Sequence, residues 1–384
     1  MVGRDMIPKP HDAITRADLE ALIANQIAER RTLEFKRELP GSSDTARKEF
    51  LADVSSFANA QGGDILFGID APGGVATAIH GLMVEDPDKE MLRWEDILLA
   101  GIEPRLPGLR LHWIDIGDRA GILLIRVPAS SIAPHRVIFK QSNRFHGRKS
   151  NGKYEMDTQE LRDAFTASEA LPARLRALHL DAVDQALRGD LPVGLGDDPK
   201  AVLSLIPVTI FREARDLEIT PENALAAHKP SGHMEAVRMI EGVLNYSVPS
   251  DPQAGRSYAI TYRQGRIDMV WTIGRIVNEL RKQETPLVWP KRFEDGVIDA
   301  ANSGAAKLAP FGVEGPWLVM VTVAGIKDYR LVLNSEYWSD PAWRDQASLP
   351  PLMIEQMNRA ALIPLLRAFW LAFGEERPAT LLHR

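Results

Sequence analysis

Cysteine is absent from the 384 residues of the chain. Its absence excludes disulfide bonds, thiol nucleophiles and zinc sites with cysteine ligands. The sequence also lacks a P-loop, a G-x-S-x-G nucleophile elbow and an H-x-x-x-H pair. These absences remove the usual motifs for phosphate-loop nucleotide binding, serine hydrolysis and histidine-based metal binding.

Long hydrophobic runs are missing too. The nearest candidate, residues 360–373, is interrupted by Pro364 and Arg367, and a membrane-spanning helix needs about 20 apolar residues. The first 20 residues contain no apolar core of the kind found in signal peptides. We therefore expect a cytoplasmic protein with no membrane contact, which also fits the lack of cysteine.

The chain has fewer basic than acidic residues, and the basic residues are unevenly distributed along the sequence. The net charge of −6 argues against general affinity for nucleic acid. From Arg119 to Tyr154 inclusive, however, the sequence has eight Lys or Arg residues and no Asp or Glu, so the rest of the chain carries −14. A local basic face of this kind is compatible with a restricted contact with phosphates.

The length and the hydrophobic patterns predict two domains of the α+β class. A chain of this size exceeds one ordinary core. We expect an α+β domain over residues 1–168, a helical linker over 169–199 and a second mixed α+β domain over 200–384. The Gly, Asp and Pro residues near 189–199 mark the boundary.

Alternation and helical spacing predict the elements of the first domain. "TLEFKREL" predicts a half-buried strand over 32–39 with Glu34 and Lys36 on its polar side. The other predicted elements are helices over 15–29, 41–63, 87–104 and 156–168, and strands over 64–70, 109–117, 121–128 and 135–148. In the second domain we expect strands over 201–210, 256–271 and 317–333, and helices over 272–283 and 350–373.

Three carboxylates form a candidate metal site. Glu29 precedes the strand that carries Glu34, and Asp70 ends what we expect to be a neighbouring strand. Converging carboxylates suit Mg²⁺ or Mn²⁺, which activate water and offset phosphate charge in phosphodiester cleavage. Lys36 is placed to stabilise the developing phosphate charge. The alternative is that these residues are ordinary exposed charges.

The basic stretch is a candidate nucleic-acid contact, because Lys and Arg neutralise phosphates and the interleaved aromatic residues can stack on bases. The alternative is a solvated hairpin whose aromatic side chains point inward. The candidate cations are Arg136, Lys140, Arg144, Arg148, Lys149 and Lys153.

An ordered set of short motifs resembles the Schlafen AlbA-type domain over about residues 15–168. The motifs are "LEFKRE", "FLADVSSFANAQGGDILFGID", "IEPRL", "ILLIRVPASSIAPHRV", "NRFHGRKSN" and "MDTQELRDAF". The resemblance implies an α+β fold. In animal Schlafens the related core is a metal-dependent endoribonuclease acting on tRNA and rRNA, and its acidic positions correspond to Glu29, Glu34 and Asp70.

The resemblance also has limits. The cysteine-containing zinc finger of the animal core is impossible here, and the resemblance fades after residue 168. Animal Schlafens use two related lobes, so the second domain or a homodimer would have to supply the other lobe.

The function expected from the sequence is therefore that of a Schlafen-like protein that binds structured RNA such as tRNA. It would cleave the RNA with Mg²⁺ or Mn²⁺, and the resemblance adds a role in defence. The alternative is a non-catalytic DNA- or RNA-binding regulatory module.

Overall fold

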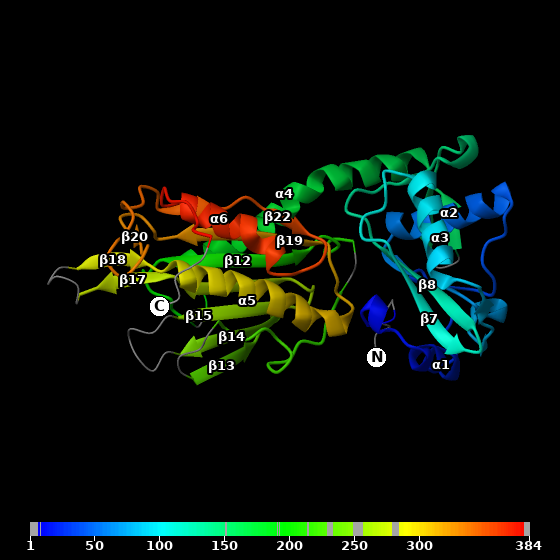
Figure 1. The fold of residues 1–384 in the computed structure, drawn as a ribbon, viewed down its shortest axis with the longest axis horizontal. Helices are drawn as coiled ribbons and strands as arrows, with labels where there is room; N and C mark the ends of the chain where they lie inside the picture. Colours follow the sequence, from blue (N-terminus) through cyan, green and yellow to red (C-terminus); the bar gives the residue numbers. More distant parts are fainter. Residues whose placement is uncertain are drawn as a thin grey trace. The chain divides into compact units, whose positions relative to one another are not determined.

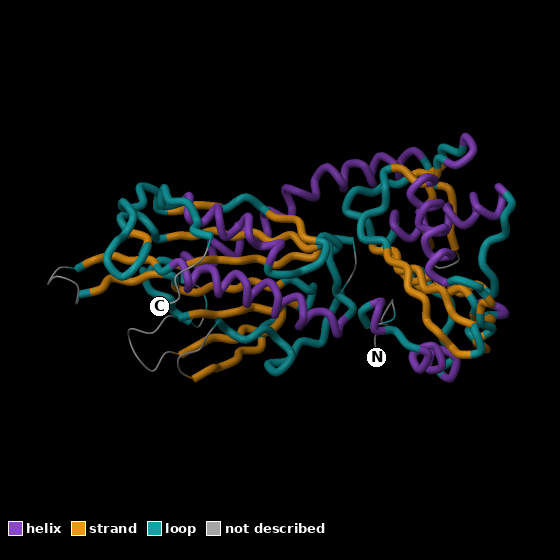
Figure 2. Tube along the Cα trace, in the orientation of Figure 1, coloured by secondary structure: helices purple, strands orange, loops and turns teal. Residues whose placement is uncertain are grey.

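The computed structural model describes residues 7, 9–149, 152–189, 191, 193–212, 215–228, 233–248, 256–278 and 284–379. The chain forms two compact units (Figures 1 and 2). The N-terminal unit runs to Pro172 and includes the short segments 211–213 and 310–312, while the C-terminal unit contains the remainder. Both units combine helices with sheets, which confirms the α+β class.

The N-terminal unit is built on a five-stranded sheet with the order β1-β2-β8-β5, in which β7 also pairs with β8. The first two strands are parallel and the other pairings are antiparallel. Parallel pairing requires a crossover connection, and here a helix supplies it. The strands are β1 (Leu33–Lys36), β2 (Gly62–Phe67), β5 (Leu82–Met83), β7 (Arg110–Gly117) and β8 (Ala120–Pro128).

The connecting helix α2 (Asp44–Asn59) carries the core of this unit, and its prediction is confirmed. Ser43 caps it by accepting a hydrogen bond from the amide of Ala46 at 3.1 Å. The buried side chains of the helix lie in one core with residues of β2 and β8. Gly63 follows with φ of +154°, and a Cβ there would lie 2.4 Å from the carbonyl oxygen of Thr32, so only glycine fits.

A four-stranded sheet with the order β11-β10-β9-β6 lies in the same unit. The single strand predicted over 135–148 is wrong, because η3 (Phe139–Gln141) interrupts it and Lys140 adopts φ of +48°. The strands are β6 (Ile102–Glu103), β9 (Arg136–Val137), β10 (Arg144–Lys149) and β11 (Gly152–Glu155).

Shorter elements complete the unit. The helix predicted over 15–29 ends early, since α1 stops at Ala24 and Gln26 has a positive φ. The strand predicted over 64–70 is split at Gly68, where φ is +101°. These elements are η1 (His11–Ala13), α1 (Arg16–Ala24), β3 (Ile69–Asp70), η2 (Pro72–Gly74), β4 (Ala78–Ile79) and α3 (Pro87–Gly101).

Helix α4 (Thr158–Arg188) is continuous although it contains Pro172. The boundary between the two compact units falls within it, after Pro172. The closing helix predicted over 156–168 is its first part, and the linker predicted over 169–199 begins inside it.

The C-terminal unit has an eight-stranded sheet with the order β13-β14-β15-β16-β12-β19-β21, in which β22 also pairs with β19. Helix α5 (Pro290–Leu308) packs against this sheet, and Figure 1 shows it running along β12. The strands are β12 (Lys200–Pro207), β13 (His233–Arg238), β14 (Gly242–Val248), β15 (Ser257–Tyr262), β16 (Ile267–Thr272), β19 (Trp317–Ala324), β21 (Gln346–Ser348) and β22 (Leu352–Ile354).

A three-stranded sheet in this unit overturns one predicted helix. Residues 274–277 form β17 (Gly274–Val277), which pairs with β18 (Thr285–Val288), and β18 pairs with β20 (Arg330–Leu331). The helix predicted over 272–283 is therefore wrong for 274–277, and its last five residues lie outside the described residues.

The predicted C-terminal helix is shorter than expected. Residues 352–354 pair with β19 as β22, η5 (Ala360–Leu362) follows, and only α6 (Ile363–Leu371) is α-helical. Helix α5 itself was not predicted from the sequence. Across the described residues, no helix is long and apolar enough to cross a membrane.

Candidate functional site

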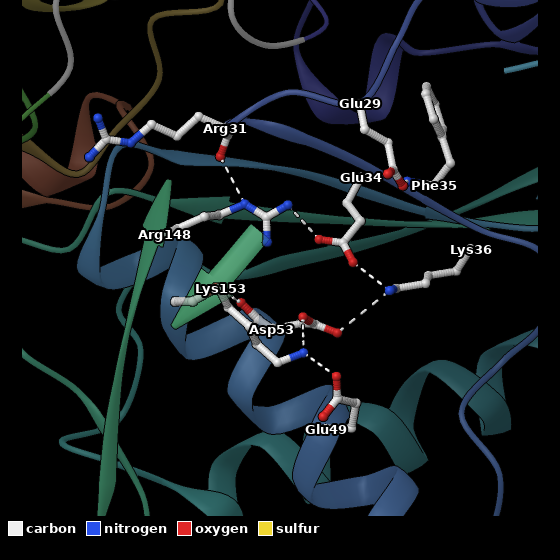
Figure 3. Close-up of polar contacts among 10 residues, drawn as sticks. Glu29, Arg31, Glu34, Phe35, Lys36, Glu49, Asp53, Arg148 and Lys153 are labelled. Atoms are coloured by element: carbon white, nitrogen blue, oxygen red, sulfur yellow. Dashed lines mark hydrogen bonds and ion pairs between the residues drawn. The ribbon is translucent and has the colours of Figure 1, made fainter. Parts of the chain in front are cut away.

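The polar side of β1 is buried. Figure 3 shows Glu34 and Lys36 of this strand pointing toward α2 and the β10–β11 hairpin. Glu34 is only 7% exposed, whereas Lys36 keeps 39% of its side chain in solvent. The alternative that Glu34 is an ordinary exposed charge is therefore wrong.

Glu34 is held by two cations. Its Oε2 lies 2.5 Å from Nη2 of Arg148, and its Oε1 lies 2.5 Å from Nζ of Lys36. Burial alone would raise the pKa of Glu34, but the charges of Arg148 and Lys36 outweigh it and lower the pKa below its ordinary value. Glu34 is thus an ionised, nearly buried carboxylate.

Arg148 is fixed on several sides and is only 4% exposed. Its Nε donates to the carbonyl oxygen of Arg31 at 3.0 Å, and its guanidinium lies 3.8 Å from the centroid of the Phe57 ring. A cation with this burial and these partners stabilises the fold, and it is poorly placed to contact a ligand.

Asp53 on α2 is the second buried carboxylate, and the sequence reasoning missed it. It is 5% exposed. Its Oδ1 lies 2.6 Å from Nζ of Lys153, and its Oδ2 lies 3.8 Å from Nζ of Lys36. Burial first and the charge of Glu34 second raise the pKa of Asp53. The sequence did carry a signal, because Asp53 interrupts the apolar stripe of its helix between Phe50 and Phe57.

These residues form one neutral network, which we call the charged cluster. Glu49 joins it by pairing with Lys153. The side chains come from β1, α2, β10 and β11, and β10 and β11 place theirs on one face because Arg148 lies opposite Lys153 in the hairpin register. The members of the charged cluster are Glu34, Lys36, Glu49, Asp53, Arg148 and Lys153.

Glu29 has a different role in the structure. Its Oε1 accepts a hydrogen bond from the amide of Phe35 at 3.0 Å. β1 is the edge strand of its sheet, so the Glu29 carboxylate occupies a donor that no neighbouring strand takes. The hydrogen bond from the Phe35 amide therefore explains why the Glu29 carboxylate lies beside β1.

Asp70 lies in β3, in a separate group of polar residues. Its carboxylate is 3.3 Å from Nη1 of Arg37 and 4.0 Å from Nδ1 of His80. Within the part of the chain that the structure describes, no three His, Asp or Glu side chains are grouped so that they could hold a metal ion. Glu29, Glu34 and Asp70 as arranged here do not fit Mg²⁺ or Mn²⁺, and the metal site stays a prediction.

Acidic partners for the basic stretch come from distant parts of the sequence. Arg136 pairs with Glu103 at 2.7 Å, and Lys140 pairs with Asp44 at 3.5 Å. A further ion pair joins Arg144 to Glu155. Lys149 is exposed, and its Nζ lies 4.2 Å from the centroid of the Tyr154 ring.

The six predicted cations therefore divide into two sets. Arg148 and Lys153 point inward and belong to the charged cluster. Arg136, Lys140, Arg144 and Lys149 are the outward cations, whose side chains reach solvent. The structure does not bring all six onto one exposed face.

Asn59 fixes this basic region to α2. Its Nδ2 donates to the carbonyl oxygens of His135 and His146 at 2.8 and 3.0 Å, and its Oδ1 accepts from the amide of His135 at 2.6 Å. One side chain thus ties the start of β9 and the middle of β10 to the end of the helix.

This geometry defines a class of domain. It is an α+β domain in which a helix connects two parallel strands and a basic hairpin packs against that helix. The family "Schlafen, AlbA_2" matches residues 29–157. The chain therefore contains a Schlafen AlbA_2 domain, and the predicted resemblance is confirmed for this segment. No curated protein matches the chain.

Two solved structures show weak similarity. A crystal structure of a Corynebacterium diphtheriae protein is 16% identical, with a TM-score of 0.27, over 38% of this chain and 27% of that one. The N-terminal domain of a RecG-related protein from Nitrosomonas europaea is 19% identical, with a TM-score of 0.28, over 35% of this chain and 88% of that one. These scores support no argument about function.

Proposed function

We propose that the Schlafen AlbA_2 domain binds nucleic acid through the outward cations Arg136, Lys140, Arg144 and Lys149. The observation that carries this proposal is the difference between the two sets of cations. Three of the outward cations are matched only by exposed carboxylates, whereas Arg148 and Lys153 are committed to buried ones.

The energetics favour exchange of the outward pairs. An exposed ion pair contributes about 0–1 kcal/mol, so a phosphate can replace the carboxylate at little cost. Breaking a buried pair costs about 3–5 kcal/mol, because the remaining charge is left without a partner. Phosphate binding by the outward cations therefore leaves the charged cluster intact.

The aromatic residues of the basic stretch favour phosphate contacts over base stacking. Phe145 packs edge-on against Phe165 of α4 with their ring centroids 6.1 Å apart. Tyr154 donates its hydroxyl to Glu160 at 2.8 Å. Since these rings have protein partners, we expect binding to depend on phosphates and to discriminate little between sequences.

The test is a comparison of two variants of the full chain, each lacking four exposed cations. R136Q/K140Q/R144Q/K149Q removes the outward cations, and K89Q/R93Q/R105Q/R162Q removes four exposed cations elsewhere in the same unit. Affinity for single- and double-stranded RNA and DNA of equal length would be measured over a range of salt concentrations. Each lost phosphate contact lowers the salt slope by about 1.

We expect the outward variant to lose about 10-fold or more in affinity, and the control variant to bind like the wild type. Equal affinity of the two variants would refute the proposal. A preference for RNA would appear as a higher affinity for RNA than for DNA of the same length.

The second candidate is metal-dependent cleavage of structured RNA such as tRNA. The observation that favours it is that Lys36, which reaches solvent, lies beside two nearly buried carboxylates, Glu34 and Asp53. Cleavage would require Glu34 to exchange its cations for a metal, so this candidate ranks below binding.

An activity assay decides the second candidate. Wild type, E34Q and D70N would be incubated with tRNA and either Mg²⁺ or Mn²⁺, after a check that all three are folded at the assay temperature. Cleavage by the wild type that both substitutions abolish would support a nuclease. Equal cleavage by all three proteins, or no cleavage by the wild type with either metal, would refute the nuclease candidate.

A further inference from the structure

A second concentration of cations lies in the C-terminal unit, around the backbone of Ile273. The amide of Ile273 donates to the carbonyl oxygen of Pro199 at 2.7 Å, and its carbonyl oxygen accepts from the amide of Trp289 at 2.9 Å. These bonds place the loop before β12, the start of β17 and the start of α5 side by side.

Two arginines converge on Trp289. The guanidinium carbons of Arg275 and Arg292 lie 5.5 and 5.0 Å from the centroid of its ring, distances typical of cation–π contacts. Burial first, and then the positive charge of Arg275, lower the pKa of Arg292. No acidic residue stands in the first turn of α5 to offset these charges.

Two further cations reach the same place and are held by backbone oxygens. Nζ of Lys200 donates to the carbonyl oxygen of Gly196 at 2.7 Å, and Nη1 of Arg256 donates to that of Gly194 at 2.9 Å. The amide of Arg256 also bonds Oγ1 of Thr272 at 3.0 Å, next to Ile273. Carbonyl oxygens orient these cations without neutralising them.

Asp198 lies among these charges, and the residue is exposed. Partial burial of its carboxyl group raises the pKa of Asp198, while Lys200, Arg256, Arg275 and Arg292 all act in the opposite direction. Asp197 is the other carboxylate that acts on Lys200. Among the residues that the structure describes, this group therefore contains four cations and two carboxylates.

We propose that this group, the Trp289 cluster, binds the phosphate group of a ligand. The Trp289 cluster comprises Asp198, Lys200, Arg256, Trp289, Arg275 and Arg292. Guanidinium groups recognise phosphate oxygens through paired hydrogen bonds, and Asp198 competes with the phosphate for the same cations. The site lies outside residues 29–157 and does not depend on the proposed function of the N-terminal domain.

Free nucleotides and nucleic-acid strands share this phosphate chemistry, so the experiment uses three probes on the full chain. These are inorganic pyrophosphate, a nucleoside 5′-triphosphate without added metal and a fluorescently labelled 12-nucleotide single strand. Binding would be measured by calorimetry or fluorescence polarisation for the wild type, R275Q/R292Q, D198N and the control R359Q. Arg359 is an exposed arginine elsewhere in the C-terminal unit.

The variants should change affinity in opposite directions. We expect R275Q/R292Q to bind about 10-fold more weakly, since two charge-assisted contacts are lost. D198N should bind about 2–5-fold more tightly, because a competing carboxylate is removed. R359Q should match the wild type. A merely structural role for Asp198 would not produce the gain.

The probes then identify the source of the phosphate. Binding that R275Q/R292Q weakens supports the site: with pyrophosphate and the triphosphate it indicates a free phosphate compound, and with the strand alone it indicates nucleic acid. No binding of any probe below about 1 mM, or equal affinities of R275Q/R292Q and R359Q, would overturn it. If the double variant unfolds, the gain expected for D198N decides alone.

Discussion

The loss of Arg148 should strongly destabilise the N-terminal unit. In Arg148→Met, Glu34 stays nearly buried and keeps only Lys36 as an ionic partner. Removing one member of a buried pair costs about 3–5 kcal/mol. The variant also loses the hydrogen bond to the carbonyl oxygen of Arg31 and the contact with Phe57. We therefore expect a loss near the upper end of that range.

The matched control is Arg144→Met, which also removes an arginine of β10. Its ion pair with Glu155 is exposed, with side-chain exposures of 62% and 53%, so its loss should change the free energy of unfolding by at most about 1 kcal/mol. Comparison of the two variants separates burial from charge, because both lose one positive charge from the same strand.

Hydrogen exchange is the suitable assay, because two compact units need not unfold together. Amide protection of α2 and β2 would report on the N-terminal unit alone. A loss of 3–5 kcal/mol corresponds to a decrease in protection of about 100-fold to several thousand-fold. Equal protection in Arg148→Met and Arg144→Met would refute the view that Arg148 is a structural cation.

The pH dependence of this difference is a second check. Because the pKa of Glu34 is lowered in the folded wild type, its contribution is fully present above its ordinary pKa of 4.5 and is lost as the pH falls through the folded value. In Arg148→Met, burial favours the protonated form of Glu34. The gap in stability between the two proteins should therefore narrow as the pH falls below about 4.5.

Three further predictions concern the C-terminal unit. Burial lowers the pKa of His179 from 6.5 to about 4. The unfolded state therefore binds the proton first, and this unit should lose about 3 kcal/mol of stability between pH 6.5 and 4. Urea unfolding at several pH values should show that the free energy of unfolding depends less on pH in His179→Gln than in the wild type. Gly296→Ala should destabilise the unit by about 1–3 kcal/mol in thermal unfolding, because its Cβ would lie 2.3 Å from the Trp271 ring. Arg377→Gln should cost about 3 kcal/mol, because it leaves Glu294, which is 1% exposed, without its paired guanidinium at 2.8 Å.

Each of these predictions has a control. An unchanged pH slope in His179→Gln would contradict the assignment to that residue. Gly194→Ala adds a methyl group where no atom lies within 4 Å and should be neutral. Arg367→Gln removes an exposed arginine. If it lowers the stability as much as Arg377→Gln does, the buried pair of Arg377 and Glu294 contributes no more than an exposed charge.

Local patterns predicted a useful part of the N-terminal domain. The alternation of residues 32–39 placed Glu34 and Lys36 on one side of a strand, and the structure confirms it with their contact at 2.5 Å. The apolar stripe predicted α2, although the helix ends at Asn59, earlier than predicted, and Gly62 already begins β2. Both predictions succeeded because side-chain direction in a strand or helix follows from backbone geometry over a few residues.

The long-range partners were decided only by the tertiary structure. The basic stretch contains no acid, yet Arg136 pairs with Glu103 and Arg148 pairs with Glu34. Likewise, residues 274–277 were predicted as helical, but they pair with β18 as a strand. Tertiary contacts override local preference in such segments.

The sequence alone therefore determined the α+β class, the presence of a Schlafen AlbA-type domain and the faces of its main elements. It did not determine that Asp53 would complete the charged cluster, that Glu29 would bond the edge of β1, or that cations would gather around Trp289. Those arrangements depend on which distant segments pack together, since the energy of a buried charge is set by its neighbours in space.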